Sequence, residues 1–138
     1  MTGCEAALER CGYLTVLRMG FTVATKDLTT ADFDELTNRE GITLVDFWAE
    51  WCGPCHRFAP VFERASEENP DILFAKVDTD AEMDLVTRFR ISSIPTLMAI
   101  RDGVIVFQQA GALPPQMLRS LIDQVRELDM EEVKSRAS

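Results

Sequence analysis

The chain has 138 residues, of which 46% are hydrophobic, which suffices for one domain with a buried core and is too short for two ordinary domains. Its formal net charge is -9 at pH 7, so the phosphates of a nucleic acid would be repelled rather than bound. No stretch approaches the ~20 consecutive apolar residues that a membrane-spanning helix requires. We therefore expect a single domain that binds neither nucleic acid nor membrane.

The first residues do not have the pattern of a secretory signal, which needs positive charge first and then an uninterrupted apolar stretch. Glu5, Glu9 and Arg10 interrupt the early part, and only Cys11–Leu17 is free of charge. We therefore expect a cytoplasmic location and a flexible N-terminal extension over residues 1–20.

The first expected elements are a short edge strand over Phe21–Ala24 and a helix over Ala31–Arg39. Thr30 offers the N-cap of this helix, and Gly41 is expected to end it. Ile42–Trp48 follows as a nearly continuous apolar run, which predicts a central strand covered on both faces.

A long helix is expected from about Cys52 to Asn69, with a kink at Pro60. The next buried strand is predicted over Ile72–Val77, and a further helix over Ala81–Phe89.

Two strands, Thr96–Ile100 and Val104–Phe107, flank the sequence Asp102-Gly103, which is a strong hairpin signal. The last helix is expected to start near Pro114-Pro115, because proline is tolerated in the first turn of a helix. The order β-α-β-α-β-α-β-β-α is typical of an α/β domain.

The most specific motif is Trp51-Cys52-Gly53-Pro54-Cys55, between a buried strand and a helix. A cysteine at the start of a helix lies near unsatisfied N–H groups and the positive end of the helix dipole, which favour the thiolate. Cys52 is therefore the expected nucleophile. Cys55 follows one helical turn later, where it can attack a mixed disulfide at Cys52 and act as the resolving thiol.

Two other interpretations of this cysteine pair are less well supported. A zinc site would need a second pair of soft ligands, but Cys4 and Cys11 are seven positions apart and His56 is the only histidine. A purely structural disulfide fits poorly with the flat apolar surface of the flanking Trp51 and Pro54. We expect no metal, and redox chemistry inside the cell rather than a disulfide framework.

The segment Val45–Cys55 resembles the active-site segment of the thioredoxin family. Ala75–Asp78, Ile94–Thr96 and Gly111–Leu113 resemble that family's third strand, its cis-proline loop and its substrate-groove glycine. The similarity covers about Phe21–Leu128.

The resemblance implies a thioredoxin fold, an α/β architecture with a central mixed sheet of about five strands and about four flanking helices. It places the thioredoxin domain at residues 21–130, followed by a charged C-terminal tail at residues 131–138.

The resemblance also implies roles for residues outside the cysteine pair. A cis peptide before Pro95 would turn the backbone of Ile94 outward, where it can pair with an extended substrate strand. The expected docking surface consists of Trp51, Gly53, Pro54, Ile94 and Gly111. Trp48 is expected in the core.

Asp46 is a carboxylate in an otherwise buried strand. Desolvation should raise its pKa and allow it to accept a proton from Cys55. Lys76 is expected to approach Asp46 from the adjacent strand, as in the family.

The implied function is general reduction of protein disulfides, with the chain recharged by a flavin-containing thioredoxin reductase that is supplied by NADPH. No cofactor is expected in this chain, which we expect to be a monomer. Two alternatives remain: a disulfide oxidase or isomerase on the same fold, and a non-catalytic binding module.

The sequence departs from the family at three places. His56 stands where the family often has lysine, and Ser92-Ser93 replaces a frequent basic-glycine pair. Both could alter the choice of partner, although His56 is expected to be an ordinary exposed helical residue. Cys4 and Cys11 lie outside the similarity, in the eighteen residues before Met19.

Overall fold

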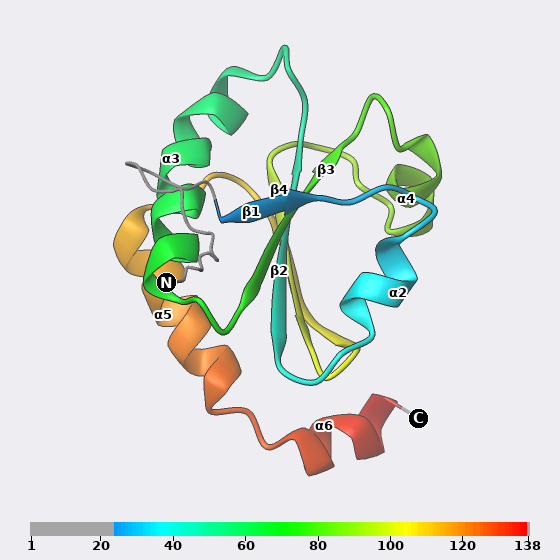
Figure 1. Ribbon diagram of the computed structural model, residues 1–138, viewed down its shortest axis with the longest axis vertical. Helices are drawn as coiled ribbons and strands as arrows, with labels where there is room; N and C mark the ends of the chain where they lie inside the picture. Colours follow the sequence, from blue (N-terminus) through cyan, green and yellow to red (C-terminus); the bar gives the residue numbers. More distant parts are fainter. Residues whose placement is uncertain (1–23, 138) are drawn as a thin grey trace, which may run out of the picture.

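The computed structural model describes residues 24–137 and contains one five-stranded sheet with helices on both faces (Figure 1). The elements, in chain order, are β1 (Thr25–Asp27), α2 (Phe33–Thr37), β2 (Ile42–Trp48), α3 (Gly53–Glu68), β3 (Leu73–Asp78), α4 (Met83–Arg88), β4 (Thr96–Arg101), β5 (Val104–Ala110), α5 (Pro115–Arg126) and α6 (Met130–Ala137).

The strand order is β1-β3-β2-β4-β5, so β2 lies at the centre of the sheet. β1 and β2 both pair with β3 in parallel, whereas β4 pairs with β2 and β5 in antiparallel fashion. This arrangement confirms the expected α/β class and the mixed sheet. The bounds predicted for β2 are also confirmed, because this strand has the strongest apolar signal in the chain.

Each face of the sheet has its own apolar core. On one face Leu44 of β2 packs with Phe58 and Phe62 of α3 and with residues of α5. On the other face Val45 and Phe47 pack with residues of α2 and α4. Figure 1 shows these two helix pairs on opposite sides of the sheet. Alternate residues of β2 therefore face different helices.

The first strand and helix differ from their predictions. Ala24 is not in a strand, and β1 is formed instead by the polar residues Thr25–Asp27, which an edge strand tolerates; Phe21 to Val23 lie outside the described residues. Thr30 does not cap α2, because its N–H and hydroxyl donate to the Glu82 carboxylate at 2.8 and 3.1 Å. The N-cap position is Asp32.

Two turns around β2 and β4 are built from residues with positive φ. Gly41 (φ +93°) does not end α2, which stops four residues earlier; it turns the chain into β2. Its N–H donates to Asp102 Oδ1 at 2.8 Å. Asp102 (φ +53°) and Gly103 (φ +82°) form the predicted hairpin turn between β4 and β5.

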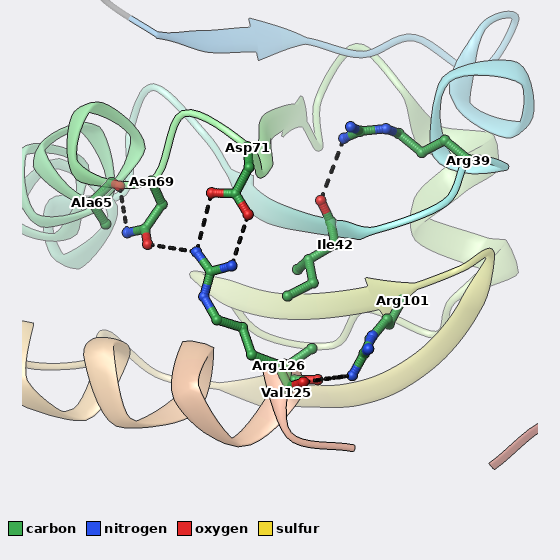
Figure 2. A network of polar contacts seen from close by, with 8 residues as sticks. All are labelled: Arg39, Ile42, Ala65, Asn69, Asp71, Arg101, Val125 and Arg126. Atoms are coloured by element: carbon green, nitrogen blue, oxygen red, sulfur yellow. Dashed lines mark hydrogen bonds and ion pairs between the residues drawn. The ribbon is translucent and has the colours of Figure 1, made fainter. Parts of the chain in front are cut away.

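The C-terminal end of α5 is fixed by two arginines (Figure 2). Arg126 of α5 donates to both carboxylate oxygens of Asp71 at 2.7 and 3.2 Å, and to Asn69 Oδ1 at 2.9 Å. Arg101 of β4 donates to the carbonyl of Val125 at 2.7 Å.

Helix α6 was not expected from the sequence, which predicted a charged tail over these residues. Half of its eight residues are charged, and its Lys134 Nζ lies 3.9 Å from Asp102 Oδ2 in the β4–β5 turn. Pro60 lies inside α3 as expected, and the kink there stays a prediction.

Candidate functional site

Cys52 and Cys55 lie where the central strand β2 leads into helix α3. Cys52 is the N-cap of α3, and its Sγ accepts the N–H of Cys55 at 3.2 Å. The two sulfurs form a disulfide. Both residues are almost fully buried, with 4% and 2% of their surfaces exposed, so exposure alone does not separate their roles. The capping contact does, because it places the Cys52 sulfur at the helix N-terminus.

The residues predicted to dock a substrate converge beside Cys52. Trp51 is 71% exposed, and its Nε1 donates to Asp80 Oδ2 at 3.0 Å. The Ile94-Pro95 peptide is cis, as expected. The Ile94 carbonyl oxygen lies 3.8 Å from the Cys52 sulfur. Trp51 and Ile94 line one shallow groove together with Asp80, Met83 and Ser93.

The other predicted docking residues, Gly53, Pro54 and Gly111, are not among the residues that line this groove. Gly53 and Pro54 are exposed and form the first two positions of α3. Gly111, with φ +112°, donates its N–H to the Pro95 carbonyl at 2.8 Å and thereby holds the loop with the cis peptide. A side chain at position 111 would have space but would be strained by the backbone conformation.

Asp46 lies in the middle of β2 and is completely buried. Among residues 24–137, neither of its carboxylate oxygens has a hydrogen-bond partner. Its desolvation raises the pKa of this carboxyl from 3.8 to about 7, and the charge of Lys76 opposes that shift. The residue two positions earlier, Leu44, packs against α3, so Asp46 faces the same side of the sheet as the helix that carries Cys55.

Lys76 is the partner of Asp46 in the register between β2 and β3, as expected. Within residues 24–137, however, the two side chains form no ion pair within 4.0 Å. The Lys76 ammonium instead lies 4.8 Å from the centroid of the Trp48 ring. Lys76 therefore acts on Asp46 through its charge and not through a direct contact.

Trp48 packs against the cluster of Ala49, Cys52 and Cys55 but is only half-buried, so it lies at the edge of the core and not within it as expected. The contacts of the His56 side chain were not predicted from the sequence. It is exposed, but its Nε2 lies 2.6 Å from the Glu50 carbonyl oxygen, and its ring stands edge-on to Trp48 with centroids 6.4 Å apart. No periodicity or motif points to this pair, and the same holds for the contact between Trp51 and Asp80.

The described part of the chain contains neither a metal-binding cluster nor a membrane-spanning helix. No group of three or more histidine, cysteine or acidic side chains there could hold a metal ion. No helix among these residues is long and apolar enough to cross a membrane.

Comparisons with known proteins agree on one family. A family model described as Thioredoxin matches residues 24–124. The "Putative thioredoxin 2" of Streptomyces coelicolor is 53% identical over 111 residues, which are 80% of this chain and 83% of that protein. The thioredoxin of Bacillus subtilis is 40% identical over 85 residues, 61% of this chain and 82% of that protein.

A solved structure gives the same result for the fold. The structure of Plasmodium falciparum thioredoxin is similar with a TM-score of 0.67 and 36% identity, over 72% of this chain and 98% of that chain.

Proposed function

The chain belongs to the thioredoxin family and is a thiol–disulfide oxidoreductase, and on this premise we propose that it is a general reductase of protein disulfides in which Cys52 attacks and Cys55 resolves. The observation that carries the assignment is the position of Cys52 as the N-cap of α3. There its sulfur accepts an N–H bond and lies at the positive end of the helix dipole, both of which stabilise a thiolate.

The reaction consists of two exchanges. The Cys52 thiolate attacks one sulfur of the substrate disulfide, so a Cys52–substrate bond forms and the other substrate sulfur leaves as a thiolate. Cys55 then attacks the Cys52 sulfur, which forms the Cys52–Cys55 disulfide and releases the second substrate thiolate. Cys55 must lose its proton before this attack.

Asp46 is the proposed acceptor of the Cys55 proton. A carboxylate whose pKa lies near 7 is well matched to proton transfer at neutral pH. The positive charge of Lys76 lowers the pKa of Asp46 against the effect of burial, and we assign Lys76 the role of keeping this acceptor ionisable near neutral pH.

The substrate is a protein segment that docks in the groove beside Cys52. Trp51, Gly53 and Pro54 form one side of the contact, and Ile94 and Gly111 form the other. The Ile94 backbone is available to pair with an extended strand of the substrate.

We also propose partners, a location, an oligomeric state and domain bounds for the protein. The family implies disulfide-containing protein substrates and a reductase as partners. We assign the recharging step to a thioredoxin reductase that draws electrons from NADPH, with the protein acting as a cytoplasmic monomer. The catalytic unit is residues 21–130, with residues 1–20 as an extension and residues 131–138 as a C-terminal segment that lies mostly in α6.

A test of the thiol roles uses reduction of insulin with NADPH and a thioredoxin reductase. Cys52→Ser is expected to abolish reduction, and Cys55→Ser to retain partners as mixed disulfides, because attack needs Cys52 and release needs Cys55. Abundant trapped partners on the Cys52→Ser protein would reverse the assignment. Activity without turnover by any reductase would instead favour an isomerase.

The role of Asp46 is tested by separating the two exchanges in stopped-flow reduction of a model disulfide. Asp46→Asn should slow the resolution step far more than the first attack by Cys52, because only resolution requires the Cys55 proton to move. Equal rates of resolution in the two proteins would show that Cys55 gives its proton to water or to another group.

A further inference from the structure

His56 stands at the fourth position of α3, directly after Cys55. Its side chain reaches back across the start of the helix to the Glu50 carbonyl. We propose that His56 is a positioning residue for dithiol–disulfide exchange, which braces the segment before Cys52 and so favours closure of the Cys52–Cys55 disulfide. This proposal rests on the function assigned above.

The geometry defines which atom donates. The Glu50 carbonyl oxygen can only accept, so the hydrogen bond at 2.6 Å requires a proton on His56 Nε2. The contact closes a ring from residue 50 to residue 56 that contains both cysteines. A backbone hydrogen bond from His56 N–H to the Cys52 carbonyl at 3.3 Å divides this ring.

A second contact fixes the orientation of the imidazole. Its ring stands at 78° to the Trp48 ring, in an edge arrangement that aromatic pairs prefer. Trp48 itself packs against both cysteines. An exposed side chain normally samples several rotamers, but this one is held at its tip by Glu50 and along its ring by Trp48.

The His56–Glu50 bond favours the disulfide because the sulfur–sulfur bond and the hydrogen bond order the same segment, so each forms more easily when the other is present. In the oxidised protein the sulfur–sulfur bond itself holds Cys52 beside Cys55. In the dithiol and in the mixed disulfide that bond is open, and the His56–Glu50 bond is then the side-chain link that spans both cysteines. A more ordered segment loses less conformational entropy when Cys55 attacks the Cys52 sulfur, which is the closing step of the reaction.

The readout is the equilibrium between the full-length protein and glutathione, followed by the ratio of disulfide to dithiol. His56→Phe keeps an aromatic ring beside Trp48 and removes the donor. We expect the equilibrium constant for forming the Cys52–Cys55 disulfide to fall by up to about fivefold, the factor for a net hydrogen bond of ~1 kcal/mol that is weaker in the dithiol than in the disulfide. This corresponds to a potential ~20 mV less negative.

Rescue by a conservative change separates the donor from the charge and the ring. His56→Gln supplies an N–H donor at a similar distance from the backbone without an imidazole, and it should remain within about twofold of the unmodified protein. Glu67→Phe, on an exposed position three turns further along α3, is the control for an added aromatic side chain and should leave the equilibrium unchanged.

A change that only weakens the fold destabilises disulfide and dithiol alike and leaves the equilibrium with glutathione in place. An unchanged constant in His56→Phe would therefore overturn the proposal, as would a fall in His56→Gln equal to that in His56→Phe. The measurement needs only the Cys52–Cys55 disulfide, so it reports the effect of the His56–Glu50 bond even where the thiol roles are reversed. Those roles are tested separately by the serine variants.

Discussion

Asp46 carries a carboxyl group in the centre of the sheet, and the described part of the chain offers it no hydrogen-bond partner. With a pKa of about 7 in the folded protein and 3.8 as its ordinary value, this group is protonated in the folded chain and ionised in the unfolded chain between these two pH values. The folded state then binds more protons, so stability falls as pH rises through this window. Above pH 7 the full loss has occurred and no further change follows.

Replacement of Asp46 by Asn removes this loss. The interval from 3.8 to about 7 corresponds to about 4 kcal/mol. The free energy of unfolding of Asp46→Asn, relative to the unmodified protein, should therefore rise by about that amount between pH 4 and pH 8. Urea unfolding of the oxidised proteins at several pH values measures the difference, and any pH-independent cost of the amide cancels. A difference that does not vary with pH would show that Asp46 is ionised throughout.

The residues of the site were predictable to different degrees. Cys52, Cys55 and Pro95 carry their signal in local sequence, and the structure has the expected disulfide and cis peptide. Asp46 was found because a charge is rare in a buried strand. The contacts of His56 with the Glu50 carbonyl and of Trp51 with the Asp80 carboxylate were not predicted. Such contacts depend on how loops lie relative to one another in the folded chain.

At the scale of elements, the C-terminal end of α5 depends on Arg101 more than on Arg126. Arg101 Nη1 donates to three carbonyls, those of Val125, Arg126 and Leu128, at 2.7, 2.9 and 3.0 Å. The last carbonyls of a helix have no partner within the helix, and a cation there also interacts well with the helix dipole. The pair of Arg126 with Asp71 is more exposed, at 38% and 62% of the two side chains.

The hydrogen bonds and the exposure of the two arginines predict that removing Arg101 costs more stability than removing Arg126. Arg101→Met should lower the free energy of unfolding by about 2 kcal/mol, because it leaves the part-buried carbonyls of Val125 and Leu128 without a charged donor. Arg126→Met should lower it by at most about 1 kcal/mol, as is usual for exposed ion pairs. Urea unfolding with an unchanged m-value is the measurement. An equal or reversed order would mean that Arg101 is not the main anchor of α5.

The elements were predictable where burial dominates the sequence pattern. β2 matches its predicted bounds, and α5 begins at Pro115, where the last helix was expected to start. Short exposed elements have no such pattern: β1 is recognised by its pairing with β3, and half of the residues of α6 are charged. Their residues are polar, so periodicity gave either the wrong position or no helix at all.

At the scale of the whole molecule, the oxidation state of the Cys52–Cys55 pair contributes to the free energy of unfolding of the domain. The disulfide closes a loop of four residues, from Cys52 to Cys55. In the chain-entropy model a loop of this size restricts the unfolded chain by about 2 kcal/mol. This is a sizeable part of the 5–15 kcal/mol by which folded domains are usually stable.

The oxidised protein should therefore resist unfolding better than the reduced protein by about 2 kcal/mol. The folded and unfolded forms of the oxidised and the reduced protein make a closed thermodynamic cycle. The disulfide must therefore be favoured over the dithiol more strongly in the folded chain than in the unfolded chain, by the same free energy. Urea unfolding of both forms gives one side of the cycle. Glutathione equilibria of the native and the urea-unfolded chain give the other. If reduction left the unfolding midpoint unchanged, the folded structure would exert no preference for the disulfide, and the driving force for reducing substrates would have to lie in the thiols alone.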